Sequence, residues 1–399
     1  MRKILFVDSK YDAIGGMQWL TRSIGAQWAM TFVRTEEEAL KKLAENDDFD
    51  AVVINPQSNA EKGMGLLAEL MRHHPRPVRM ILSDKLDQEM LTKWLGPAHR
   101  RLSRSCTAAD LEKAIERACA LRDLLANESL QRVVAQMDSL PSLPSVYAQL
   151  IEELQSPSPS VRKVGEIIAH DLALTAKVLQ VVNSAFFGLR RKITSPSEAT
   201  MFLGLDTIIS LVLAISVFSH FNAKRLSNFS PEALWSHSLQ TAVFAKQIVR
   251  LERHADKMAE DAFTAGLLHD AGKIVLATML PEWYEQALRL VADKRYLFAD
   301  AEQEVFGTTH AEVGAYLFGL WGLPDQIIEA VAFHHRPGDR AGGDFDALIA
   351  VHAADIFEHE GRSYTPVPDF GYLERNDLLE RFMSWRNVCL RMRGAEEGS

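Results

Sequence analysis

The hydrophobic pattern of this 399-residue chain changes at two closely spaced prolines, Pro141 and Pro144, and that change limits what the chain can fold into. Before the prolines, short apolar runs typical of buried strands alternate with helical patterns, which is the rhythm of a parallel sheet covered by helices. After them the pattern is almost entirely helical. The strands expected before the break are residues 3–7, 28–33, 51–54, 78–82 and 100–102, with a helix at 36–45. We therefore expect a doubly wound α/β domain followed by an all-α domain.

One helical pattern, residues 108–137, runs up to this break, with apolar residues at i, i+3, i+4 and i+7. The prolines end it, because each removes a backbone donor and restricts the residue before it. Such a helix either pairs with its copy in a homodimer or packs on its own domain, and the pattern leaves both alternatives open. The expected parts are an α/β domain, a connecting helix, an all-α domain and a helical tail, at residues 1–122, 123–139, 140–361 and 362–399.

Charge and composition argue against several classes of protein. The net charge of −9 and the pI near 5.8 disfavour direct nucleic-acid binding, which normally needs a basic face. Residues 208–221 form a largely apolar run that is too short to cross a membrane, so we expect a buried helix there. The apolar run at residues 4–7 is too short for a signal peptide. The few cysteines lack metal-type spacing and suit a reducing cytoplasm; they are Cys106, Cys119 and Cys389.

Polar residues follow the expected strands, at the edge of a parallel sheet where function usually lies. They are Asp8, Asn55, Ser83 and Arg104. The pattern of residues 1–122 resembles the receiver domain of response regulators, a flavodoxin-like fold. That resemblance implies an acidic pair after the first strand, a phosphate-accepting Asp after the third, Ser or Thr after the fourth and Lys after the fifth.

The chain departs from that receiver pattern at the residues that carry the chemistry. Asp8 is followed by Ser9 instead of a second acid, and Asn55 stands at the acceptor position. An amide cannot form an acyl phosphate, and the loss of one carboxylate weakens a magnesium site. We therefore expect a pseudo-receiver, a docking or dimerising module. The alternative, a doubly wound domain that binds another ligand, is less favoured because no Gly-rich phosphate loop is present.

The all-α part contains an adjacent His-Asp pair, His269 and Asp270, within the apolar segment 262–276, which we interpret as one helix. Buried polar groups need partners, and a divalent metal would supply one for both side chains. Lys273 would face the same way, placed for an anionic oxygen. A satisfied structural pair is the alternative.

Further histidines and an aspartate surround this pair in the sequence: His237, His310, His334, His335 and Asp355. Their order and residue types resemble the HD-domain superfamily of metal-dependent phosphohydrolases, and the full set resembles its cyclic-dinucleotide phosphodiesterase branch, called HD-GYP. The resemblance implies that these five residues, with His269 and Asp270, bind metal, and we expect two ions. Mixed histidine and carboxylate ligands favour iron, manganese or zinc. It also places Lys273 near a phosphate.

The segments from Leu143-Pro144 through residues 167–175, 182–188 and 199–205 resemble the HDOD domain, a bacterial signalling relative of the HD domain. A second His-Asp pair lies there, His170 and Asp171, and we expect Asp171 to cap the following helix instead of binding metal. HDOD proteins are thought to act through contacts with partner proteins.

Two departures argue against cyclic-dinucleotide hydrolysis. No Gly-Tyr-Pro segment follows His335, and Ala233 stands where trinuclear members of the family supply a Glu. We therefore expect a cytoplasmic bacterial signalling protein that binds metal and acts through partner proteins. The alternative is a metal-dependent phosphodiesterase acting on a cyclic dinucleotide or another nucleotide, with Asp270 and Lys273 as catalytic residues.

Overall fold

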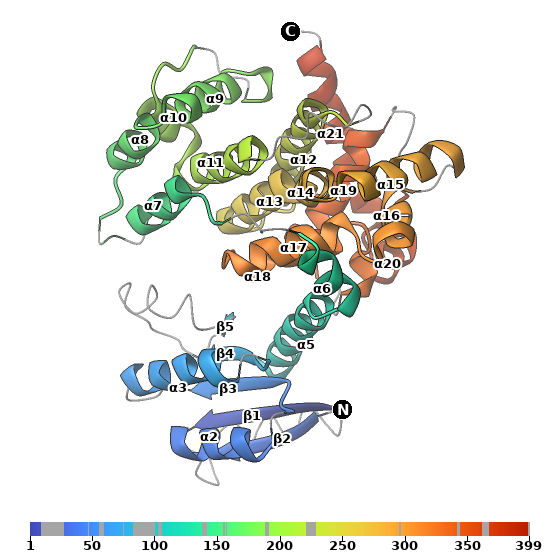
Figure 1. Ribbon diagram of the computed structural model, residues 1–399. Helices are drawn as coiled ribbons and strands as arrows, with labels where there is room; N and C mark the ends of the chain where they lie inside the picture. Colours follow the sequence, from blue (N-terminus) through green and yellow to red (C-terminus); the bar gives the residue numbers. More distant parts are fainter. Residues whose placement is uncertain are drawn as a thin grey trace. The chain divides into compact units, whose positions relative to one another are not determined.

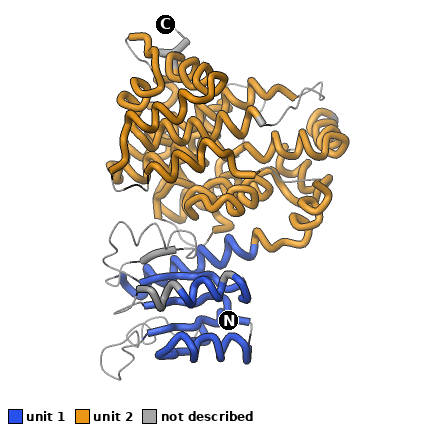
Figure 2. The backbone as a smooth tube through the Cα atoms, turned by 60° about the vertical axis from the view of Figure 1, so that its left-hand side comes forward, with its two compact units in different colours: residues 1–123 blue, residues 124–399 orange. Residues whose placement is uncertain are grey.

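The chain forms two compact units, residues 1–123 and residues 124–399 (Figure 2). The computed structural model describes residues 1–8, 28–46, 48–55, 60–74, 76–82, 100–102, 106–137, 142–154, 156, 158–187, 191–220, 229–294, 297–340, 344–360 and 367–397. Each unit is described by itself below. Ser83 and Arg104, two of the residues expected at the sheet edge, lie outside the described residues.

The first unit is built on a parallel five-stranded sheet with the order β2-β1-β3-β4-β5 (Figure 1). The strands are β1 (Arg2–Asp8), β2 (Trp28–Val33), β3 (Ala51–Asn55), β4 (Val78–Leu82) and β5 (Arg100–Leu102). Its described helices are α2 (Glu36–Glu45), α3 (Ala60–His73) and α5 (Ala108–Leu125). The predicted parallel sheet, including its short last strand, is confirmed.

Both faces of this sheet are buried, which explains the nearly continuous apolar runs of its strands. Ile4 and Phe6 belong to a core with residues of α5, whereas Leu5 and Val7 belong to a second core with residues of α2 and α3. Alternate side chains of β1 therefore point to opposite faces.

The described elements of the second unit are all helices (Figure 1). Its elements are α6 (Glu128–Ala135), α7 (Ser145–Leu154), α8 (Val161–Ala169), α9 (Leu172–Val182), η2 (Ala185–Phe187), α10 (Pro196–Leu203), α11 (Leu205–His220), α12 (Pro231–Leu251), α13 (Asp256–Leu268), α14 (Ala271–Met279), α15 (Pro281–Lys294), α16 (Phe298–Phe306), α17 (His310–Leu320), α18 (Asp325–Phe333), η3 (Pro337–Asp339), α19 (Ala347–His359), α20 (Phe370–Arg375) and α21 (Leu379–Glu397). The expectation of an all-α C-terminal part is confirmed.

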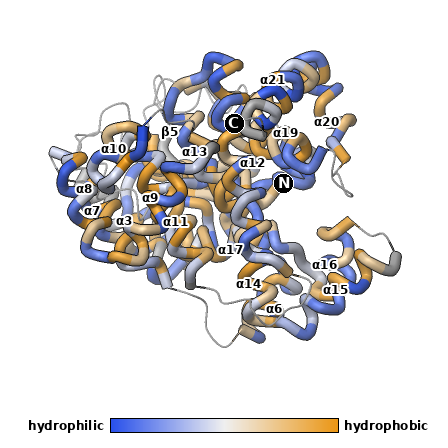
Figure 3. The backbone as a smooth tube through the Cα atoms, turned by 90° about the horizontal axis from the view of Figure 1, so that it is seen from above, coloured by the Kyte–Doolittle hydropathy of each residue, from blue (hydrophilic) through white to orange (hydrophobic). Residues whose placement is uncertain are grey.

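Of two helical segments expected from the sequence, the first differs from the structure and the second is confirmed. The single helix expected over residues 108–137 is wrong: α5 ends at Leu125, and Asn127 caps α6 by accepting a hydrogen bond from the backbone of Ser129. Asn favours such caps over helix interiors. Residues 208–220 of the expected apolar run lie in α11, which is mostly hydrophobic, whereas α21 is largely hydrophilic (Figure 3). Among the described residues, no helix combines the length and apolarity that a membrane span requires.

Candidate metal centre

The His269–Asp270 pair lies at a junction between two helices, not within one helix as the sequence indicated. α13 ends at Leu268 and α14 begins at Ala271, so the pair occupies the corner. The Lys273 backbone N–H donates to the carbonyl of Asp270, which starts the new helix. At a corner, side chains can point in directions that one continuous helix does not allow. Both members of the pair are buried.

Two glycines let other helices approach this corner closely. A Cβ atom on Gly266 would lie 2.6 Å from Cα of Ala242 in α12. A Cβ atom on Gly272 would lie 1.9 Å from the carbonyl oxygen of His310 in α17. No side chain fits in either place. The glycines on either side of the pair therefore bring α12 and α17 within reach of it.

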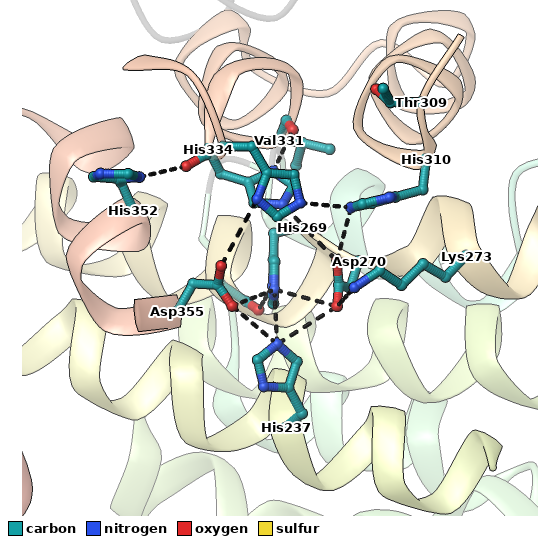
Figure 4. A network of polar contacts seen from close by, with 12 residues as sticks. His237, His269, Asp270, Lys273, Thr309, His310, Val331, His334, His352 and Asp355 are labelled. Atoms are coloured by element: carbon teal, nitrogen blue, oxygen red, sulfur yellow. Dashed lines mark hydrogen bonds and ion pairs between the residues drawn. The ribbon is translucent and has the colours of Figure 1, made fainter. Parts of the chain in front are cut away.

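All seven residues predicted as ligands come together there (Figure 4). His237 comes from α12, His310 begins α17, His334 and His335 follow α18, and Asp355 lies on α19. They form two groups whose donor atoms lie within 4.8 Å of one another: Asp270, His310, His334 and His335 form the first, and His237, His269 and Asp355 the second. All are buried except His335, whose side chain is 25% exposed.

Asp270 connects the two groups through its two carboxylate oxygens. Oδ1 lies 3.1 Å from Nε2 of His310 and 3.8 Å from Nε2 of His334. Oδ2 lies 3.5 Å from Nε2 of His237 and 3.6 Å from Nε2 of His269. Each oxygen thus faces the imidazoles of one group, so Asp270 could provide one carboxylate oxygen to an ion in either group.

Four of the imidazoles are anchored by Nδ1, which leaves Nε2 directed into the site. Nδ1 of His269 donates to the carbonyl of Gly266, and Nδ1 of His334 donates to the carbonyl of Val331, each at 2.8 Å. A carbonyl only accepts, so in both rings Nδ1 carries the proton and Nε2 keeps its lone pair. Nδ1 of His237 and of His310 meet carboxylates instead, each at 2.5 Å.

The inward-facing nitrogen atoms fit a metal because they lie close to one another and to the two aspartates. Nε2 of His237 and Nε2 of His269 lie 3.0 Å apart, and so do Nε2 of His335 and Nε2 of His310. Two lone pairs at that distance repel unless a cation or a proton lies between them. Nε2 of His334 is buried and makes no hydrogen bond with the described part of the chain. A buried polar atom without a partner is unusual, and a metal would satisfy it.

The protonation equilibria of His334, His335 and Asp270 also favour metal binding. Burial, together with the neighbouring histidines, holds the pKa of His334 and of His335 well below the usual range, so both rings are neutral. Burial alone would raise the pKa of Asp270, but Lys273 and the histidines hold it well below its usual range. Burial would lower the pKa of His237, yet hydrogen bonds with Asp355 and Glu358 raise it to about 9. Neutral imidazoles and ionised carboxylates are the forms that bind metal, so His334, His335 and Asp270 are ready to bind, whereas an ion would have to displace a proton from His237.

Lys273 lies beside this centre, with Nζ 2.6 Å from Oδ2 of Asp270. Its side chain is 16% exposed, and Nζ also lies 5.4 Å from the centre of the Phe298 ring. The opposite charge of Asp270 raises the pKa of Lys273 despite burial, so the ammonium stays charged. Lys273 and His335 are the residues of the centre with solvent access.

Sequence reasoning missed three nearby groups: Glu302, Glu358 and His359. Glu358 and His359 form a third cluster of donors with His237. They follow Asp355 by three and four residues, so helical spacing alone places them on the face of that ligand. No helical spacing of this kind identifies Glu302, which lies eight residues before His310.

The expected pocket of the first unit shows a different arrangement. Asp8 and Asn55 are paired across β1 and β3, and Nδ2 of Asn55 donates to Oδ2 of Asp8 at 3.2 Å. Both side chains are buried, 2% and 9% exposed. The amide therefore already provides a donor for the carboxylate.

Comparisons with known proteins agree with the helical architecture. The family model of the HDOD domain matches residues 140–337, which confirms the expected HDOD domain. An HDOD domain protein of unknown function from Geobacter sulfurreducens superposes with a TM-score of 0.54 at 23% identity, over 68% of this chain and 99% of that one. That likeness shows the fold.

Two curated relatives are similar over shorter segments. An uncharacterised protein of Treponema pallidum is 26% identical over 204 residues, 51% of this chain and 39% of that protein. The cyclic di-GMP phosphodiesterase CdgJ of Vibrio cholerae is 29% identical over 122 residues, 31% of this chain and 27% of that protein. The chain therefore spans well under half the length of either relative.

Proposed function

With an HDOD domain at residues 140–337, we propose that this protein works in signal transduction, with two divalent metal ions held in its helical unit and a receiver-like first unit that accepts no phosphoryl group. It acts chiefly through contacts with other signalling proteins. The metal centre modulates those contacts, with a nucleotide as the candidate ligand.

One observation carries the metal assignment: the two oxygens of Asp270 face separate sets of imidazoles. His310, His334 and His335 would hold one ion and His237, His269 and Asp355 the other, with Asp270 shared. Mixed imidazole and carboxylate donors favour iron, manganese or zinc over magnesium. When bound, such ions supply Lewis acidity and an activated water.

The receiver assignment of the first unit is supported by the parallel strand order and the position of Asn55. Asn55 stands at the carboxyl end of β3, opposite Asp8 on β1. Its amide is not a nucleophile for phosphate and already donates to Asp8. The proposal therefore gives this unit a docking role without phosphorylation.

A second function, phosphodiester hydrolysis, is favoured by Lys273. Its ammonium lies beside the bridging carboxylate and is partly exposed, so it can hold an anionic oxygen that approaches from solvent. Asp270 would keep both that ammonium and the ion positions in place. The similarity to a cyclic di-GMP phosphodiesterase names the substrate class to test first.

Metal analysis of the purified protein tests the primary proposal. We expect about two ions per wild-type chain and a loss of bound metal in the double variant His269→Ala, Asp270→Ala. The matched control is His170→Ala, which alters the other His-Asp pair and should keep the metal. A wild type that binds no metal when offered iron, manganese or zinc would overturn the proposal.

Assays with cyclic di-GMP then separate the two functions. Metal-dependent turnover that Lys273→Ala reduces and His170→Ala preserves would establish an enzyme. Tight binding without turnover would establish a sensor. For the first unit, we expect no covalent label from acetyl phosphate, and labelling would contradict the pseudo-receiver assignment.

A further inference from the structure

Two buried glutamates lie behind the candidate metal centre and belong to neither of its two main donor groups. Glu302, on α16, is fully buried, and its Oε2 accepts from the backbone N–H of His310 at 2.9 Å and lies 2.5 Å from Nδ1 of the same residue. Glu358, on α19, is 2% exposed, and its Oε2 lies 2.5 Å from Nδ1 of His237. Each glutamate thus contacts the outer nitrogen of one imidazole.

The two donor groups repeat the same plan. Each has one aspartate, one imidazole backed by a glutamate and one imidazole backed by a carbonyl of its own helix. In the first group these are Asp270, His310 and His334; in the second they are Asp355, His237 and His269. Carbonyls fix the orientation of two of the four rings, so orienting a ring does not require a carboxylate. The glutamates beside the other two rings add a negative charge.

We propose that Glu302 and Glu358 are positioning residues, each setting the affinity of one metal position through the histidine it contacts. This inference rests on the proposed function, since it needs the two ions. A carboxylate that accepts from Nδ1 fixes the tautomer, orients the ring and makes Nε2 a stronger donor. Glu302 acts on the position of His310, and Glu358 acts on the position of His237.

Burying these two carboxylates costs free energy, which supports a role for them in cation binding. A buried carboxylate is unfavourable unless charge and hydrogen bonds compensate for lost hydration. Oε1 of Glu302 is buried and makes no hydrogen bond within the described residues. A neutral side chain would serve packing better there. A cation on the far side of the imidazole would compensate the charge through the ring.

Affinity measurements on Glu302→Gln and Glu358→Gln test the inference. Glutamine keeps the length and an acceptor oxygen while removing the charge. Competition with a chromogenic chelator, using zinc as the probe, should show two sites in the wild type. Each variant should weaken one site about 10- to 100-fold and leave the other unchanged. The matched control is Glu153→Gln, a buried glutamate that contacts Ser160 and Lys163 and belongs to no donor group.

Double variants assign each glutamate to its position. Glu302→Gln combined with His334→Ala should weaken zinc binding no further than His334→Ala alone, because both changes affect one ion. Combined with His269→Ala, it should weaken both ions. The reverse pattern, or equal effects in both combinations, would overturn the assignment of Glu302.

Thermal unfolding separates positioning from simple packing. With zinc, the glutamine variants should gain less in Tm than the wild type; after chelation, their Tm should match the wild type within about 2 °C. An equal drop with and without zinc would show a packing role and overturn the inference. The wild type could instead bind three zinc ions, with Glu358→Gln losing one ion and keeping the affinities of the other two. That result would show that Glu358 and His359 hold a third ion, and it would also overturn the inference. A wild type that binds no zinc would instead contradict the proposed function itself.

Discussion

The two units each bury an aspartate at the boundary of a structural element, Asp8 at the end of β1 and Asp270 just before α14, and they satisfy it in different ways. In the first unit, Asp8 faces the amide of Asn55. In the second, Asp270 faces four imidazole nitrogens and the ammonium of Lys273. An amide donates a hydrogen bond to the carboxylate and leaves no need for an ion. Imidazoles with anchored Nδ1 atoms present lone pairs, which only a proton or a metal can satisfy.

The pockets also differ in how the fold builds them. Asp8 and Asn55 lie opposite each other because β1 and β3 are adjacent in register, so backbone pairing alone brings them together. The candidate metal centre gathers side chains between His237 and Asp355 from several helices and their ends, and it depends on close helix packing. We therefore expect the second pocket to be the more sensitive to packing changes and to ions, and the first to be sensitive mainly to local charge.

The largest effect should come from Gly272→Ala. Its Cβ would lie 1.9 Å from the carbonyl of His310, so α14 and α17 must separate. We expect a loss of at least about 3 kcal/mol in the unfolding free energy of the second unit, together with the bound metal. Chemical denaturation with metal analysis measures both. The control is Gly394→Ala, a helical glycine with no neighbour within 4 Å, where alanine should be neutral or stabilising. Equal stability of the two variants would contradict the close packing.

Metal removal should affect one unit and spare the other. A ligand that binds only the folded state at 100 times its Kd stabilises that state by about 3 kcal/mol. Chelation should therefore lower the Tm of the helical unit, and restored zinc should recover it. Hydrogen exchange, which reports the two units separately, should show the loss of protection in α13, α14 and α17 and unchanged protection in β1 and β3. Lost protection in both units would contradict the separation drawn between the pockets.

Asn55→Asp would give the first pocket the charge that it lacks. Two buried carboxylates would then face each other, which we expect to cost about 2 kcal/mol at neutral pH. Repulsion raises the folded-state pKa of one carboxyl, so the cost is present above that pKa and disappears as the pH falls through it. Denaturation at several pH values, with and without magnesium, measures this. Asn55→Ala is the control, because it removes the hydrogen bond without adding charge, and its deficit should depend on pH much less. A pH-independent deficit in Asn55→Asp would show that the pair is solvated.

Residue type and hydrophobic period predicted the strands of the sheet, the helical second unit and the seven side chains that the structure brings together, because each leaves a local signal in the sequence. The corner at His269 and Asp270 was not predicted, since apolar helical residues continue on both sides of it. The end of α5 was missed for a related reason: the cap at Asn127 is one residue within a favourable pattern.

The backing glutamates were missed because glutamate on a helix is normally exposed. Their burial and their contacts, of Glu302 with His310 and of Glu358 with His237, become visible only in three dimensions.

The smallest effect should come from the second His-Asp pair, which tests whether the dipeptide alone has any meaning. Asp171 accepts a hydrogen bond from the backbone of Leu174 at 2.9 Å and caps α9, as expected from the sequence. Asp171→Ala should therefore cost about 1 kcal/mol in unfolding free energy and leave the metal content unchanged. Asp171→Asn, which keeps a capping oxygen, should restore most of that stability. If either change released metal, the distinction between a capping pair and a ligand pair would fail, because it depends on the partners that surround each aspartate and not on its histidine neighbour.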